Sequence, residues 1–221
     1  MAPTLIYCAA GNARYAQIAI NCGMLYGAQL PGTIYHPPYF VDQNWRKPNR
    51  EKYMAALAKH KPHMATVLDW EHQEQLPEVL GWAEDAAQFV DAVVIVPKVQ
   101  GGVTQLPRTV GGKMIRLGYS VPTKYGGTPL PLWEFAGWPI HLLGGGVTTQ
   151  INLSRYLTVQ SADSNLARKI AELGTVFDGK RWVRLEAYLG MRYDGKDMIY
   201  TAFEISCRNI KQAWDKLAHH A

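Results

Sequence analysis

The amino-acid sequence predicts a compact (β/α)8 barrel of parallel strands, on three observations. Seven apolar runs of strand length recur along the 221 residues, and the segments between them are long enough for a helix or a loop. Three of the runs end in carboxylates, as barrel strands often do at a catalytic edge. Because such barrels usually have about 250 residues, we expect some outer helices to be shortened.

The strands are expected at the seven apolar runs, which are residues 4–10, 38–42, 64–69, 92–97, 114–119, 139–144 and 156–162. Each run is bounded by turn-forming residues and is rich in branched or aromatic side chains. An eighth strand is expected at residues 32–36, where it would complete a closed barrel.

Helices are expected where apolar residues recur at helical spacing with few breakers. These segments are residues 13–25, 50–60, 75–89 and 164–173. Asn49 is placed to cap the second helix and Ser164 the last. Glycines and prolines crowd residues 99–112 and 122–139, so we expect loops or short helices there, and residues 202–219 predict a helix that closes the fold.

The composition indicates one intracellular domain. With 48% hydrophobic and 19% charged residues, the chain can bury one large core, and we expect a single domain over residues 1–221. It has no apolar run of about 18 residues and no signal-peptide pattern, which predicts a soluble cytoplasmic protein without a membrane partner. Cys8, Cys22 and Cys207 lack metal-ligand spacing, which favours reduced thiols and argues against structural zinc.

The charge balance is compatible with a polyanionic partner. The net charge is +5 and the isoelectric point is about 9.0, and lysines and arginines that neutralise phosphates gain affinity by releasing counterions. The candidate contacts to nucleic acid are Arg46, Lys47, Arg50 and Lys124. The alternative is that these residues form only a solvated face.

Carboxylates at the ends of three apolar runs are the candidate catalytic groups. Asp42 ends one run, Asp69 and Glu71 follow another, and Asp163 follows the last. Parallel strands deliver their last residues to one edge of the sheet, where reacting groups collect. Asp163 also stands where a helix opens, so it can be a nucleophile or only a helix cap.

A second set of residues has the chemistry to hold a planar heterocycle. Its members follow buried strands and supply hydrogen-bonding groups, a stacking face or close backbone approach. They are Lys98, Gln100, Gly118, Tyr119, Gly144 and Gly145. The alternatives are that Lys98 is solvated, that Tyr119 is core and that the glycines form ordinary turns.

Taken in order, these pieces resemble the queuine/archaeosine tRNA-guanine transglycosylase superfamily, and more closely its small phage-type relatives linked to 7-deazaguanine in DNA. The matching pieces, spread over roughly residues 36–166, are Asp42, Asp69-Trp70-Glu71, Val99-Gln100-Gly101-Gly102, Leu117-Gly118-Tyr119, His141-Leu142-Leu143-Gly144 and Ser161-Ala162-Asp163. The chain departs from that pattern in two ways. The family's Ser-Gly-Gly is replaced here by Gln43-Asn44-Trp45, and the cysteine-rich zinc subdomain of the tRNA enzymes is absent, which favours DNA over tRNA.

The resemblance implies an enzyme that exchanges guanine in nucleic acid for a 7-deazaguanine such as preQ0. Asp163 would attack C1′ to give a covalent glycosyl-enzyme intermediate, and Asp42 would act as general acid/base or hold that intermediate. Asp69, Gln100 and the backbone near Gly118 would bind the Watson-Crick edge of the base. Glu71 and Lys98, which have no counterpart in the family, would be neighbours in the same base-binding set. The deazaguanine would be a co-substrate, no other cofactor is implied, and a phage-encoded chain would act in the host cytoplasm.

Other functions stay open at this point. The same intermediate can be hydrolysed, which would make the protein a base glycosylase, and the chain can instead be a non-catalytic nucleic-acid-binding barrel. A metal-dependent hydrolase is a weaker alternative, because His36, His63, His72 and His141 are scattered and form no ligand pair. DNA or RNA as acceptor, and a partner protein or a second copy of the chain, are likewise open.

Overall fold

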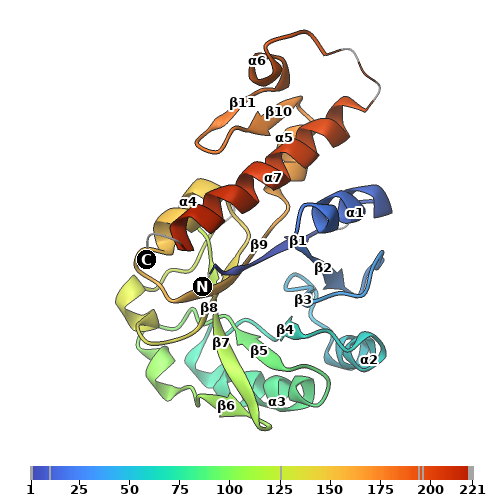
Figure 1. Cartoon of the computed structure of the whole chain (residues 1–221). Helices are drawn as coiled ribbons and strands as arrows, with labels where there is room; N and C mark the ends of the chain where they lie inside the picture. The colour runs from blue at the N-terminus through green and yellow to red at the C-terminus, as the bar shows by residue number, and fades with distance from the viewer. Residues whose placement is uncertain (1, 10, 125, 194, 196, 219–221) are drawn as a thin grey trace.

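The computed structural model describes residues 2–9, 11–124, 126–193, 195 and 197–218, and it shows a closed barrel of parallel strands (Figure 1). The hydrogen-bonded order is β5-β4-β3-β2-β1-β9-β8-β7, and β7 pairs with β5 to close the ring. The barrel strands are β1 (Thr4–Cys8), β2 (Leu25–Leu30), β3 (Phe40–Gln43), β4 (Met64–Thr66), β5 (Ala92–Ile95), β7 (Lys113–Ser120), β8 (Ile140–Leu143) and β9 (Val159–Ser164). The predicted compact (β/α)8 barrel is confirmed.

The outer layer is incomplete, as the chain length predicted. Its helices are α1 (Ala13–Asn21), α2 (Arg50–His60), α3 (Leu76–Ala87), α4 (Val147–Leu153) and α5 (Leu166–Ala171). A loop alone joins β2 to β3, and single-turn 3-10 helices serve the glycine-rich and proline-rich crossovers. These are η2 (Gly102–Gln105) and η3 (Leu132–Phe135), with η1 (Gln73–Gln75) leading into α3 and a short β6 (Thr109–Val110) antiparallel to β7.

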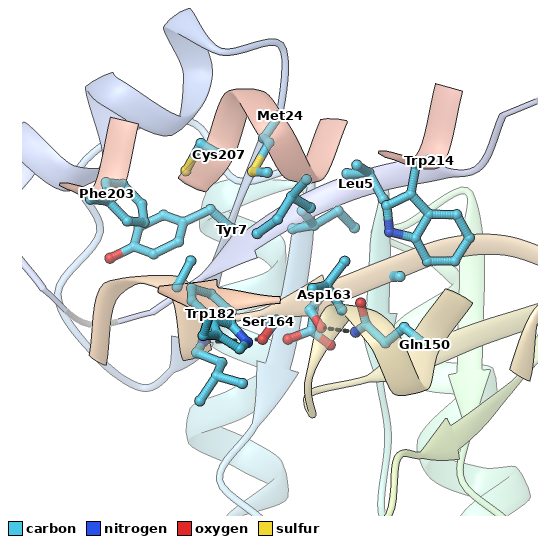
Figure 2. Close-up of a pocket in the computed structure, with 16 residues that line it drawn as sticks. Leu5, Tyr7, Met24, Gln150, Asp163, Ser164, Trp182, Phe203, Cys207 and Trp214 are labelled. Atoms are coloured by element: carbon cyan, nitrogen blue, oxygen red, sulfur yellow. Dashed lines mark hydrogen bonds between the residues drawn. The ribbon is translucent and has the colours of Figure 1, made fainter. Parts of the chain in front are cut away.

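The C-terminal region packs on the outside of the barrel. It contains an antiparallel pair, β10 (Thr175–Phe177) and β11 (Trp182–Arg184), then α6 (Leu185–Leu189) and the long α7 (Met198–Ala218). Helix α7 lies against α1, α5 and β10 (Figure 1). Figure 2 shows its buried side chains Phe203, Cys207 and Trp214 on the side of the pocket where Leu5 and Tyr7 of β1 lie. The predicted closing helix is therefore confirmed from residue 202 onward, and His219 lies outside the described residues.

The eighth strand was placed in the wrong segment. It is β2, which precedes residues 32–36, and those residues are irregular. Helix α1 ends earlier than expected because Gly23 has a positive φ of 82°. Gly27 points into the barrel, where a Cβ atom would lie 2.9 Å from Cγ2 of Ile6. Close packing requires glycine in the middle of β2. Because this glycine interrupts the apolar run, the sequence pattern did not indicate a strand there.

Two caps were expected from the sequence. The side chain of Asn49 accepts a hydrogen bond from the backbone N–H of Lys52, so this cap is confirmed. Ser164 instead ends β9, and α5 begins two residues later at Leu166. Its Oγ still accepts a hydrogen bond from the backbone N–H of Leu166 at 3.1 Å. The Ser164 hydroxyl therefore caps α5, although Ser164 itself belongs to β9.

The barrel interior has an apolar layer and a polar mouth. Ile6, Phe40, Met64 and Val94 pack together as a small cluster separate from the larger core under the helices. In parallel barrels the ends of the strands carry the site. The residues that continue these strands toward their carboxyl ends include Asp42, so the polar groups of interest rest on a packed floor.

Candidate active site

Two adjoining clefts open at the carboxyl ends of the strands. The Asp163 cleft has a volume of about 490 Å³ and is lined by Cys8, Gln29, Asp42, Asn44, Arg46, Asp163, Asn165 and Lys169, among others. The Asp69 cleft has a volume of about 350 Å³ and is lined by Asp42, Asp69, Val96, Lys98, Val121, Gly127 and Gly145, among others. Asp42, Trp45 and Gly144 line both clefts. Volumes of this size suit a small organic ligand.

Asp163 is fixed at the floor of its cleft, with only 8% of the residue exposed. The backbone N–H of Gly144 donates to its Oδ1 at 3.2 Å, and Nε2 of His141 lies 3.3 Å from the same oxygen. Its backbone carbonyl accepts from Nε2 of Gln150 at 2.8 Å, as Figure 2 shows, and that amide also donates to the Gly144 carbonyl. The carboxylate therefore has one oriented oxygen, Oδ1.

Asp42 faces the same cleft from β3 and has a different environment. Burial, followed by the negative charge of Asp163, raises the pKa of Asp42 from 3.8 to about 7. The hydroxyl of Thr66 donates to Asp42 Oδ1 at 2.8 Å and opposes that rise. A carboxyl group that titrates near neutral pH can both give and take a proton, which is what a general acid/base needs.

Cys8 ends β1 beside these two carboxyl groups, a position that sequence reasoning did not assign to the site. Burial, and then the charges of Asp163 and Asp42, raises the pKa of the Cys8 thiol well above its usual value. Because the thiolate is the nucleophilic form, Cys8 is unsuited to nucleophilic catalysis. It serves as an apolar wall of the cleft.

The sequence-predicted residues Asp69, Glu71 and Lys98 are brought together: Asp69 and Lys98 line the Asp69 cleft, and Glu71 lines a neighbouring cleft that Asp69 also borders. Nζ of Lys98 lies 2.8 Å from Oδ2 of Asp69 and 2.7 Å from Oε1 of Glu71. Burial raises the pKa of Asp69, and the Lys98 ammonium opposes that rise. The intervening Trp70 is fully buried and donates from Nε1 to the His72 carbonyl, so it anchors the turn that carries both carboxylates.

The predicted glycines have distinct roles. Gly144 and Gly145 have positive φ angles of 64° and 77°, and both line the Asp69 cleft. A Cβ atom at Gly145 would lie 2.3 Å from Cγ1 of Val121, so the close turn requires glycine. Gly118 points into the barrel, where a Cβ atom would lie 2.7 Å from Cγ2 of Val96. It shapes the floor without lining either cleft.

Tyr119 and Gln100, which were also expected to bind the base, line neither cleft. Tyr119 is buried in the outer core, with its ring packed edge-on against Phe135 at 5.2 Å between centroids, so the predicted stacking face is wrong. The physical reason is strand alternation, because Gly118 points inward and its neighbour must point outward. Gln100 lies in the exposed turn after β5 and lines neither cleft, so its predicted place in the site is also wrong.

The basic residues divide into two groups. Arg46 lines the Asp163 cleft, with its guanidinium 5.0 Å from the ring centre of the exposed Trp45, and Lys47 is exposed beside it. Lys124 is exposed in the turn that follows Thr123, a residue that lines the Asp69 cleft. Arg50 does not fit the expected contact, because it binds Asp85 and the Gly81 carbonyl of α3 at 2.8 and 2.9 Å. It joins two helices, and its charge is already paired.

Sequence reasoning missed Lys169, which lines the Asp163 cleft from α5, and gave His141 no role in the site. The signal for Lys169 was its place in a basic pair six residues after Asp163, on the first helix past the last barrel strand. Among the described residues, no group of three or more His, Cys, Asp or Glu side chains is arranged to hold a metal ion. Within the same residues, no helix is long and apolar enough to cross a membrane.

A family model matches residues 21–215, which is most of the chain. The matched residues include every barrel strand but β1. The chain belongs to this family of unknown function, DUF6610. No curated protein matches it. This DUF6610 member is similar to the YdjI aldolase from Escherichia coli K12, with a TM-score of 0.55 and 7% identity over 98% of this chain and 90% of that one. That likeness shows the barrel fold alone.

A second solved structure is that of monomers of phosphoribosylanthranilate isomerase from Thermotoga maritima. It has a TM-score of 0.39 and 10% identity, over 95% of this DUF6610 chain and 98% of that one.

Proposed function

We propose that this DUF6610 protein is a base-exchange glycosyltransferase that replaces guanine in nucleic acid by a 7-deazaguanine such as preQ0. The observation that carries the proposal is the pair of carboxyl groups in the Asp163 cleft. Asp163 has one oxygen held by an N–H donor, whereas the pKa of Asp42 is raised to about 7. Substitution at a glycosidic carbon with a covalent intermediate needs such a pair, one group to attack and one to carry the proton.

In the first half-reaction, an oxygen of Asp163 attacks C1′ of the target nucleotide. The C1′–O bond forms as the C1′–N9 bond breaks, and the electron pair of that bond leaves with guanine. Protonated Asp42 gives its proton to the departing base, which leaves as neutral guanine. The products are free guanine and a glycosyl ester of Asp163.

In the second half-reaction, the 7-deazaguanine takes the place of guanine. Its N9–H proton passes to the Asp42 carboxylate as N9 attacks C1′, and the ester bond to Asp163 breaks. Both carboxyl groups then return to their starting protonation states, so no further reactant is consumed. One acid/base group serves both steps because guanine and the incoming base occupy the same position.

The Asp69 cleft is suited to hold the base. A carboxylate of Asp69 can accept hydrogen bonds from N1–H and the exocyclic amine of a guanine-like ring. The ammonium group of Lys98 balances the charge of Asp69. The same group can donate a hydrogen bond to a carbonyl oxygen on the ring of the base. The turn at Gly144 and Gly145 gives backbone access to a flat ligand at the junction of the two clefts.

DNA is the favoured acceptor. The net charge of +5 and the exposed residues Arg46, Lys47 and Lys124 suit a phosphate backbone. A base must leave the stack to reach a barrel mouth, and the exposed Trp45 beside the clefts offers a surface for the displaced nucleotide. The order of motifs shared with the transglycosylase superfamily supports the same substrate class.

The test is incorporation of radiolabelled preQ0 into duplex DNA, single-stranded DNA or tRNA, with simultaneous measurement of released guanine. We expect label in DNA and an equal amount of guanine, both lost in Asp163→Asn. The matched control is Asp91→Asn, because Asp91 precedes β5 and lies at the opposite end of the barrel. Guanine release without incorporation would indicate hydrolysis. Unchanged nucleic-acid binding with neither reaction would indicate a binding barrel.

A further inference from the structure

A line of polar side chains runs through the barrel interior to Asp163. Ser161 on β9 and His141 on β8 are fully buried, and their Oγ and Nδ1 atoms are 2.8 Å apart. The guanidinium of Arg116 on β7 lies below them, with one nitrogen 3.4 Å from the Ser161 Oγ. The other imidazole nitrogen, Nε2, faces Oδ1 of Asp163 at 3.3 Å. Three neighbouring strands thus link an internal cation to the candidate nucleophile.

The hydrogen-bonding roles in this line follow from what each group can do. A guanidinium only donates, so Arg116 makes the Ser161 oxygen an acceptor. The single hydroxyl hydrogen of Ser161 is then available to donate, and His141 Nδ1 at 2.8 Å is a better acceptor than the sulfur of Met64 at 3.9 Å. Nδ1 of His141 therefore carries no hydrogen in this arrangement.

The charge of the ring follows from the same neighbours. A cationic imidazole would place a second positive charge in the barrel interior near Arg116, and its Nδ1–H would leave the Ser161 hydroxyl hydrogen only the sulfur of Met64, at 3.9 Å, as acceptor. The neutral ring with hydrogen on Nε2 avoids both conflicts. The ring of Phe40 packs against His141 at 4.5 Å between centroids and fixes its plane.

The hydrogen on Nε2 has one acceptor to meet. Nε2 is buried and makes no hydrogen bond of good geometry within the described part of the chain, and Oδ1 of Asp163 is 3.3 Å away. Catalytic hydrogen bonds are often long in the free enzyme and tighten in complexes. The backbone N–H of Gly144 already donates to that same oxygen at 3.2 Å.

We infer that His141 is a positioning residue, held as the neutral Nε2–H tautomer by the Arg116–Ser161 pair, which orients Asp163 so that Oδ2 is the attacking oxygen. Two N–H groups converge on Oδ1, and this leaves Oδ2 to form the bond to C1′. The assignment of Oδ2 rests on the proposed function, whereas the tautomer of His141 does not. A fixed carboxylate plane contributes to catalysis through orientation.

The tautomer is tested by nitrogen NMR of the imidazole rings in the uniformly ¹⁵N-labelled protein, with the His141 signals assigned by their loss in His141→Gln. We expect a protonated Nε2 and an unprotonated Nδ1 at neutral pH. We also expect this single state to give way to a mixture in Ser161→Ala, which removes the donor to Nδ1. A ring protonated on Nδ1, or on both nitrogens, in the wild type would overturn the inference whether or not the protein exchanges bases.

The positioning role is tested by two variants that differ in where they place an amide. The side-chain amide of His141→Gln reaches the position of Nε2, and that of His141→Asn reaches only the position of Nδ1. We expect His141→Gln to release guanine about ten-fold faster than His141→Asn, because only His141→Asn loses the hydrogen bond to the charged Asp163. The KM for the nucleic acid should be the same in both variants. Thermal unfolding of both variants measures any common loss of structure. Equal rates in two folded variants would overturn the role of Nε2.

Discussion

Asp42 and Asp163 face one cleft from strands β3 and β9, and the charge of Asp163 is the second cause, after burial, of the rise in the pKa of Asp42 to about 7. The negative charge of Asp163 therefore favours the protonated form of Asp42. This difference in charge separates their roles in the proposed reaction.

The first prediction concerns the rate of base release as a function of pH. Asp42 must be protonated to give a proton to guanine, and its pKa is about 7. The single-turnover rate should therefore be flat below pH 7 and fall about ten-fold per pH unit above it. Rapid-quench measurement of released guanine from pH 5 to 9 checks this. In Asp42→Asn the rate should fall by roughly 10²-fold or more and lose this pH dependence. A wild-type rate that rises through pH 7 would exclude Asp42 as the acid in this step.

The second prediction concerns stability. The pKa of Asp42 is about 7 in the folded chain and 3.8 by the reference value, so the folded state holds the proton more tightly. The stabilising contribution of this proton is complete below pH 4 and is lost as the pH rises through 7. Asp42→Asn, which cannot ionise, should raise the free energy of unfolding at pH 8 by about 4 kcal/mol and leave it nearly unchanged at pH 4.

Urea unfolding of wild type and Asp42→Asn at the two pH values measures this difference. The control is Asp178→Asn. The pKa of Asp178 is lowered by the backbone N–H groups of Arg181 and Lys180, so its loss should not stabilise the protein at pH 8. An Asp42→Asn variant that is less stable than wild type at pH 8 would contradict the raised pKa. Together with the loss of activity, a gain would mark Asp42 as a residue kept for function at a cost in stability.

The third prediction concerns Lys98, which pairs with Asp69 and Glu71. Without the ammonium, burial and the negative charge of Glu71 act on Asp69 unopposed, and its pKa rises further. Lys98→Met should therefore raise KM for the deazaguanine about ten-fold at pH 7 and leave kcat nearly unchanged, because the carboxylate that binds the base loses the cation that favours its charged form. Lys113→Met is the control, since Lys113 pairs with Asp91 at the other end of the barrel. A fall in kcat with constant KM would assign Lys98 to the chemical step instead.

The sequence was sufficient to predict the barrel and the strand ends that form the candidate site, because both follow from where apolar runs stop. Asp42 and Asp163 are at strand ends, and parallel strands bring such residues together whatever their separation in the chain. Strand β2 was missed because close packing demands glycine at position 27, which interrupts an otherwise apolar segment. Where the core has room only for a small residue, the strand does not form a continuous hydrophobic run in the sequence.

The finer features of the site depend on distances that the sequence does not contain. Tyr119 and Gly118 differ by one position, and one position decides which face of a strand is occupied. Arg50 was predicted to contact nucleic acid because its partner Asp85 lies on another helix and cannot be identified from the sequence. His141 was a lone histidine in the sequence, and its significance depends on Ser161, which lies 20 residues away and becomes its hydrogen-bonding neighbour only in the sheet.

The fourth prediction separates the two groups of basic residues. Arg46 lines the Asp163 cleft beside the exposed Trp45, whereas Arg50 is bound to Asp85. Arg46→Gln should weaken binding of a short duplex, and the slope of log affinity against log salt concentration should become shallower by about 1, because one phosphate contact is lost. Arg50→Gln should leave both quantities unchanged and lower the melting temperature, because it breaks the link between α2 and α3. Fluorescence anisotropy over a salt series measures the binding. If the two substitutions change the slope equally, the positive charge on this face attracts DNA without a specific contact. Arg46 would then not position the DNA backbone at the Asp163 cleft.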